Sequence, residues 1–213
     1  LMMKDALVMR KTLRLYALFL LFYSGLAVLG VFPMSMALAM VEVIVMVLPI
    51  SSFSYDEAAK WDRYAAVLPV GRTAVVKARY LFLLLVLLAA AAIGLVGSIL
   101  ASLLAREDLG ELLATLLVSM GLGLMIADIM LPVVYQLGPE RARPWMYVII
   151  FAPIVVLLGG AKLGLFDGID LSWLDQLPEL AVLGVFALVP LVPLVGMLLS
   201  CWISCRIYAR KEF

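Results

Sequence analysis

The sequence contains no histidine and only two cysteines, Cys201 and Cys205. Without histidine, the chain cannot form a histidine-bearing zinc-protease helix, a Ser–His dyad or a histidine-ligated haem site. The two cysteines lie four residues apart on a predicted helix, a spacing that does not favour a disulfide. A glycine-rich phosphate loop ending in GKS or GKT is also absent from the sequence. Catalysis by this chain alone is therefore not expected.

Charge is scarce, and long apolar runs take its place. Charged residues make up 15% of the sequence and hydrophobic residues 66%, which is unusual for a soluble domain. Several apolar runs reach the roughly 20 residues that a helix needs to cross a bilayer, and they lack the alternation of barrel strands. No cleavage site follows the first run, so it should stay in the protein. The sequence predicts an all-α polytopic membrane protein, a single domain over 1–213 with six transmembrane helices at about 15–32, 35–52, 80–105, 111–137, 145–165 and 180–205.

The basic residues are distributed unevenly over the connections between these spans. Fourteen of the sixteen Lys and Arg residues lie in the N-terminal segment, the second connection, the fourth connection or the C-terminal tail, and only Arg106 and Lys162 lie on the other side. The positive-inside rule then places both termini and residues 53–79 in the cytosol and residues 166–179 in an extracellular loop.

The N-terminal segment, residues 1–14, has one apolar and one basic helical face. Lys4, Lys11 and Arg14 lie on the basic face. This pattern predicts an interfacial helix whose basic face meets anionic lipid headgroups. A frayed cytosolic extension of the first span is the alternative.

The stretch SYDEAAKWDRYAAVLPVGR, residues 54–72, concentrates charged and aromatic residues in an otherwise apolar chain. Ser54 and Glu57 have the spacing of a capping box, which predicts that a new helix begins at Tyr55. The proline at position 69 predicts that this helix ends near Val67.

The predicted helix carries a stripe of Trp61, Ala65 and Leu68 with Tyr64 beside it. Asp56 and Lys60 have the four-residue spacing of a supporting ion pair. Its acids and bases nearly balance, so that it matches anionic lipid poorly. The pattern favours docking to another protein, with packing against its own membrane domain as the alternative.

Small side chains recur every four residues in the third predicted span, at Ala90, Gly94, Ser98 and Ser102. Such a strip lets two membrane helices approach closely. The partner is either another span of this chain or a second protomer.

The order of these parts resembles the type 2 ATP-binding-cassette (ABC) exporter permeases. The chain has an amphipathic start (KDALVMRKTLR), two spans, the segment SYDEAAKWDRYAAVLPVGRTAVVKARYL, four further spans and a basic tail ending SCRIYARKEF. More narrowly, it is similar to the small permeases of the phenol-soluble-modulin exporter group, which carry a similar series of YDE, KW, LPVSR and KYL after the second span.

This resemblance implies that the helix after the second span is a coupling helix within the cytosolic segment 53–79. The helix would sit in a groove of a separate ATPase subunit, with aromatic and apolar anchors buried there. The expected ATPase-docking residues are Tyr55, Asp56, Glu57, Lys60, Trp61, Arg63, Tyr64, Leu68 and Arg72.

The same resemblance implies a complex of two ATPase subunits and two permeases, expected as a homodimer, in a bacterial plasma membrane. ATP and Mg would bind to the ATPase subunits, and this chain would hold no cofactor and no metal. The expected cargo is an amphipathic or antimicrobial peptide, with lipid-like or drug-like molecules as alternatives. Membrane lipid is an expected partner and nucleic acid is not.

Glu42 and Asp128 are the two ionisable residues well inside the apolar runs. Such residues are costly in a bilayer and often functional. The helical rise of about 1.5 Å per residue puts both near the midplane. We predict that they line a translocation route between two protomers and attract basic side chains of a peptide. The alternative is that each is protonated or bonded to backbone freed by a kink.

A different class of function is an autonomous ion-coupled carrier in which Glu42 and Asp128 bind protons or ions. Such carriers commonly have repeated halves. The last three spans contain no counterpart of residues 54–72, which counts against this alternative.

Overall fold

The computed structural model describes residues 1–61, 64, 71–164 and 178–210. Over these residues the chain forms helices joined by short connections, and no strand. Six of the helices are long and apolar enough to cross a membrane, which confirms the predicted fold class. The helices are α1 (Met2–Val8), α2 (Arg10–Val28), α3 (Met34–Ala58), α5 (Arg72–Leu104), α6 (Leu109–Leu137), α7 (Pro139–Lys162) and α9 (Glu179–Arg210).

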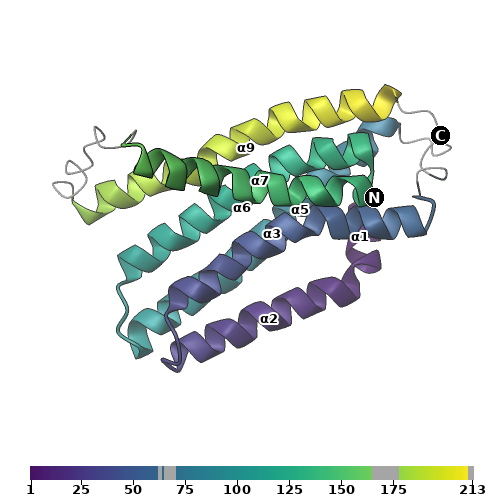
Figure 1. Ribbon diagram of the computed structural model, residues 1–213. Helices are drawn as coiled ribbons and strands as arrows, with labels where there is room; N and C mark the ends of the chain where they lie inside the picture. Colours follow the sequence, from purple (N-terminus) through teal and green to yellow (C-terminus); the bar gives the residue numbers. More distant parts are fainter. Residues whose placement is uncertain (62–63, 65–70, 165–177, 211–213) are drawn as a thin grey trace.

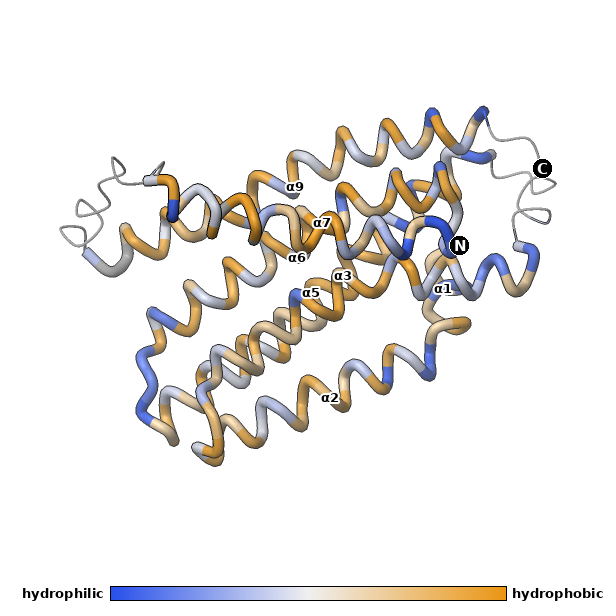
Figure 2. Tube along the Cα trace, in the orientation of Figure 1, coloured by the Kyte–Doolittle hydropathy of each residue, from blue (hydrophilic) through white to orange (hydrophobic). Residues whose placement is uncertain are grey.

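The six long helices lie side by side in one bundle, and α1 lies across one end of it (Figure 1). That end, here called the proximal end, also holds the last turn of α3, the first turns of α5 and α7 and the last turn of α9 (Figure 1). The connections 29–33 and 105–108 lie at the opposite, distal end. Figure 2 shows hydrophilic residues gathered toward the two ends and hydrophobic residues along the middle. The proximal end is the one that the sequence assigns to the cytosol.

Helix α6 is central to the bundle because it packs against α3, α5, α7 and α9. Gly94 of α5 faces this core, where an added Cβ would lie 3.1 Å from both Leu38 of α3 and Leu116 of α6. Ser98 is fully buried and donates a hydrogen bond to the Gly94 carbonyl oxygen. The small-residue strip of the third span therefore packs inside this chain, which is one of the two alternatives left by the sequence.

The prediction that a new helix begins at Tyr55 is wrong. Helix α3 runs without a break from Met34 to Ala58 and contains Pro49 in its interior. Pro49 is buried, and its packing outweighs the one helical hydrogen bond that a proline removes. The N–H groups after Ser54 lie inside a helix, so that they have no need of a side-chain cap. The predicted end near Val67 lies outside the described residues, as do residues 166–177 of the predicted extracellular loop.

The N-terminal segment is not one helix, as the sequence predicted, but two. Helix α1 ends at Val8, and α2 begins at Arg10 after a turn at Met9, whose side chain is buried in the core. Helix α1 packs against α5. Lys4, assigned above to a lipid-facing surface, instead forms ion pairs within the chain. The basic face is broken because a buried carboxylate on α1 draws Lys4 inward.

Gly121 lies where the backbones of α6 and α9 nearly touch. An added Cβ would lie 2.8 Å from the carbonyl oxygen of Val189. We expect Gly121→Ala to destabilise the bundle by about 1–3 kcal/mol, because the two helices must move apart. Thermal unfolding in detergent measures the effect. Gly184→Ala is the matched control, since its Cβ would meet nothing within 4 Å; equal unfolding temperatures for the two variants would contradict the prediction.

Candidate functional site

Four charged side chains from three helices meet at the proximal end. Lys4 and Asp5 belong to α1, Asp56 to the last turn of α3, and Arg79 to the second turn of α5. Asp5 and Arg79 are each 5% exposed and Asp56 is 9% exposed. This group is called the charge ring below.

The charge ring is closed by four contacts in which cations and carboxylates alternate. The Lys4 Nζ lies 2.9 Å from Asp5 Oδ1 and 2.6 Å from Asp56 Oδ1. The Arg79 Nη2 lies 3.5 Å from Asp5 Oδ1 and donates a short hydrogen bond to Asp56 Oδ2. Each carboxylate therefore contacts both cations, and α1, α3 and α5 are joined at one point.

Aromatic rings flank both cations of the ring. The Arg79 guanidinium lies 4.5 Å from the ring centroid of Phe53, and the Lys4 ammonium lies 4.1 Å from that of Trp61. Phe53 in turn makes an edge contact with Tyr135 of α6. These contacts give the charges a partly desolvated environment, in which cation–π attraction is stronger than at an exposed surface.

The predicted docking residues divide into two groups in the structure. Asp56 and Trp61 contact their own chain: Asp56 pairs with Lys4 and Arg79 rather than with Lys60, and Trp61 packs against the core. The prediction of an Asp56–Lys60 ion pair is therefore wrong, because Lys60 follows the end of α3 with a left-handed φ of 50°.

The second group faces outward. Tyr55 is 41% exposed and Tyr64 is 64% exposed, and Glu57 and Lys60 are also exposed. The Tyr55 hydroxyl also shares a hydrogen bond of 2.8 Å with the Thr12 hydroxyl of α2. Arg72, by contrast, donates a hydrogen bond of 3.0 Å to the Ala209 carbonyl oxygen of α9. The two remaining predicted residues, Arg63 and Leu68, lie outside the described residues.

Sequence reasoning missed Asp5 and Arg79 as site residues. Arg79 contributed only to the count of basic residues, and Asp5 received no role. Two local signals mark them: Asp5 is the one acid in a basic segment, and Arg79 lies where the third apolar run begins. Neither signal identifies a partner that is 74 positions away in the chain.

The two membrane carboxylates lie on neighbouring helices. Glu42 of α3 is half-buried beside Gly123 of α6, whose added Cβ would lie 3.3 Å from the Glu42 Cα. Both carboxylate oxygens of Asp128 are buried, and no group of the described residues donates to them. An added Cβ at Gly196 of α9 would lie 3.4 Å from Asp128 Oδ2. Within the described residues no hydrogen bond or ion pair joins Glu42 to Asp128, and Asp128 faces α9.

A small hydroxyl cluster continues from Asp128 toward the proximal end. The Ser200 hydroxyl donates to the Asp128 carbonyl oxygen over 2.5 Å. The Tyr80 hydroxyl lies 2.6 Å from that of Ser200 and 2.8 Å from that of Ser204. This cluster joins α5, α6 and α9. Its α5 member, Tyr80, follows Arg79 of the charge ring in the sequence.

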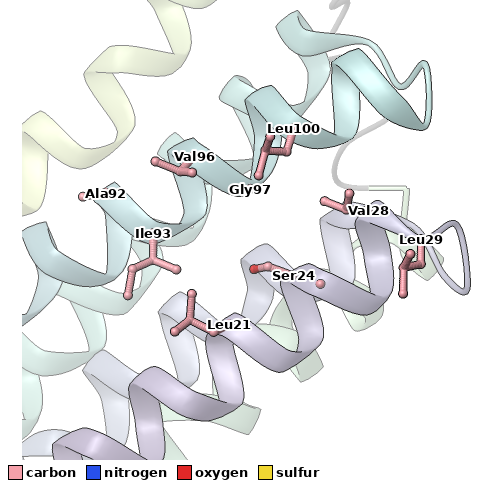
Figure 3. A pocket seen from close by; sticks show the side chains of 10 residues that line it. Leu21, Ser24, Val28, Leu29, Ala92, Ile93, Val96, Gly97 and Leu100 are labelled. Carbon is pink, nitrogen blue, oxygen red and sulfur yellow. The ribbon is translucent and has the colours of Figure 1, made fainter.

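A cavity of about 470 Å³ lies between α2 and α5, away from these polar groups (Figure 3). Its lining is almost entirely apolar, with Leu21, Ile93 and Leu100 among the side chains and the Ser24 hydroxyl as a polar exception. None of the predicted site residues lies in it.

Comparison with protein families identifies the class. The sequence model of the family described as ABC-2 family transporter protein matches residues 1–209. The chain belongs to this family. No curated protein and no solved structure matches the chain.

Membership of the ABC-2 family confirms the broad resemblance drawn from the sequence. The chain is the transmembrane permease subunit of an ABC transporter and is not itself catalytic. ATP hydrolysis in an ABC-2 transporter belongs to an ABC ATPase partner. The narrower relation to the phenol-soluble-modulin exporters stays a prediction.

Among the described residues, the proximal end of this ABC-2 permease combines polar and aromatic groups outside the apolar runs. It contains the charge ring, the outward-facing side chains of Tyr55 and Tyr64 and the first turns of α5 and α7. The charge ring is largely buried, and the exposed surface that contains Tyr55 and Tyr64 lies beside it.

Proposed function

We propose that this chain is the permease subunit of an ATP-driven exporter and that an ABC ATPase docks on the proximal end of α3. The observation that carries the proposal is the exposed aromatic and charged surface of Tyr55, Glu57, Lys60 and Tyr64 in a chain without its own phosphate loop. Aromatic side chains of this kind are frequent anchors at protein interfaces. Trp61 is not part of this exposed surface, because it packs against the core of its own chain.

The continuous helix α3 gives such a partner a means of acting on the membrane domain. Its 25 residues span about 38 Å at a rise of 1.5 Å per residue. Force applied near Tyr55 reaches Glu42 without an intervening loop, and α3 packs against α6 over this length. Closure of two ATPases around nucleotide would therefore shift α3 relative to α6 in this proposal.

The proposed complex contains two ATPase subunits, each binding ATP and Mg, and two copies of this chain in a bacterial plasma membrane. Both termini of the chain face the cytosol in this arrangement. The proposed cargo is an amphipathic or antimicrobial peptide. The support for this arrangement is the family membership, the basic residues of the proximal end and the resemblance of residues 54–81.

Isolation of the full chain from its native membranes in mild detergent tests the proposal. We expect an ABC ATPase to co-purify and the isolated complex to hydrolyse ATP. Reconstituted vesicles should then move peptide only when ATP is supplied. Transport driven by a proton or sodium gradient with the chain alone would reject the proposal in favour of the ion-coupled carrier.

Glu42 and Asp128 remain the proposed residues of the translocation route. Glu42→Gln should lower export of a cationic amphipathic peptide several-fold, because the half-buried carboxylate no longer attracts its basic side chains. Asp128→Asn should have a smaller effect, since the Asp128 carboxylate oxygens are buried against α9 in this conformation. Export of an uncharged analogue of the peptide is the control. Equal losses for the cationic and uncharged peptides would remove both residues from the route.

A further inference from the structure

We infer that the charge ring holds the proximal end of α3 against α1 and thereby positions the surface on which the ATPase docks. In this assignment Arg79 is a positioning residue for the end of α3. Helix α1 contacts α3 and α5 through its charged side chains and is not a lipid-binding helix. The holding role follows from the contacts of the chain itself. The positioning role rests on the proposed function.

The first step is the topology of the contacts. Asp56 closes the last turn of α3 and Arg79 lies in the second turn of α5, so that their hydrogen bond ties together the two ends of the segment 57–78. Lys4 binds Asp56 and also lies over the ring of Trp61. The ring therefore contacts the predicted docking segment at two points, one on each side of its exposed residues Glu57 and Lys60.

The second step concerns α1. This helix has seven residues, too few to be stable by itself in water. Its apolar side chains Met3 and Leu7 are 80% and 64% exposed, whereas Met2 and Ala6 are partly buried against the core. Asp5, which is buried, and Lys4 supply its polar contacts to α3 and α5. The apolar contacts of Met2 and Ala6 keep α1 against the bundle, and the charge ring fixes its polar face relative to the end of α3.

The third step is the energetic cost of the arrangement. Burying Asp5, Asp56 and Arg79 beside the partly buried Lys4 requires desolvation that their mutual attraction offsets only when the geometry is good. Arg79 also buries its Nε and Nη1, to which no acceptor among the described residues is bonded. Apolar side chains of similar volume would give equal or greater stability. A role in fixing one orientation of α1, α3 and α5 explains the ring better than stability does.

Asp5→Asn is the sharpest single change, because it removes one charge of the ring and leaves the Arg79–Asp56 hydrogen bond intact. The variant should fold. The amide hydrogens of residues 52–61 and of α1 should exchange with solvent at least about tenfold faster than in the wild-type chain. Exchange in the middle of α6 should not change. Asp5→Glu, which keeps the charge, should restore most of the protection.

Hydrogen exchange is measured on the full chain alone, and association with the ABC ATPase is measured separately. Glu140→Gln is the control, since Glu140 is an exposed carboxylate in the first turn of α7, which lies at the same end of the bundle. We expect Asp5→Asn, but not Glu140→Gln, to weaken ATPase association about tenfold or more.

Each outcome decides a different point. Unchanged exchange of residues 52–61 in Asp5→Asn would overturn the inference. Faster exchange with unchanged ATPase association would overturn the positioning role. If the wild-type chain binds no ABC ATPase while Asp5→Asn exchanges faster, the proposed function fails, and the holding of α3 by the charge ring is still supported.

Discussion

Replacing Arg79 with glutamine is expected to lower the free energy of unfolding by about 3–5 kcal/mol. The guanidinium contacts both Asp5 and Asp56 in a site where all three side chains are buried. Without it, Lys4 alone faces two buried carboxylates, and one negative charge is left without a partner. An uncompensated buried charge is among the most destabilising changes that a single substitution can make.

A double-substitution cycle separates this effect from a loss of packing. Asp56→Asn in the Arg79→Gln background removes the excess negative charge, so that the double variant should be less destabilised than the sum of the two single variants. Unfolding in mixed micelles with increasing denaturing detergent measures all four proteins. Arg141→Gln is the control, because Arg141 is an exposed basic residue in the first turn of α7. This variant should change stability by less than about 0.5 kcal/mol. Additive effects in the cycle would show that the charges do not act together.

The membrane spans could be predicted because each one depends on the length and hydropathy of its own stretch of sequence. A bilayer core of fixed thickness selects apolar helices of roughly 20 residues, whatever their neighbours. All six predicted spans overlap the observed helices. The boundaries differ most where a helix continues beyond the apolar run, as α5 does when it begins at Arg72 rather than near residue 80. Polar residues extend such helices at the ends of the bundle, and hydropathy does not detect them.

The start of the coupling segment could not be predicted because two local signals competed with a tertiary one. The proline at position 49 and the capping pair Ser54 and Glu57 both favour a break in the helix. The observed helix continues because Leu48, Pro49 and Ile50 are buried against the bundle. A capping motif stabilises a helix end where the chain has one. The motif alone does not show that the helix ends or begins at that position.

The charge ring could not be predicted because its members are far apart in the sequence. Asp5 and Asp56 reach Arg79 across 74 and 23 positions. Charge patterns along a helix identify partners three or four residues away and no further. The ring forms only once α1 has folded back over the ends of α3 and α5, so that its discovery required the tertiary structure.

The same distinction determines which docking residues are worth testing. The family resemblance implies the same role, as buried anchors for an ATPase, for Trp61, Tyr64 and Leu68. In the structure, Trp61 packs against its own core and beneath Lys4, so that Trp61→Ala would disturb the chain as well as any interface. The side chains of Tyr55 and Tyr64 are exposed, and neither packs in the core. Tyr55 also makes an exposed hydrogen bond to the Thr12 hydroxyl.

Alanine at both Tyr55 and Tyr64 is therefore expected to weaken association with the ABC ATPase about 100-fold or more. Anchoring tyrosines contribute about 2 kcal/mol each at the centre of an interface, and about 1.4 kcal/mol corresponds to a tenfold change in affinity. Binding of the purified ATPase to the permease in nanodiscs measures the change. The fold should be retained, because neither side chain belongs to the core.

Tyr147→Ala provides the matched control for this result. Tyr147 lies on α7 and is 57% exposed, close to the 64% of Tyr64, and it is not among the predicted docking residues. Loss of an exposed tyrosine at this position should leave ATPase binding at the wild-type level. If the Tyr55→Ala/Tyr64→Ala variant also binds normally, the ATPase contacts another part of the proximal end, and the aromatic surface at the end of α3 is not the docking site.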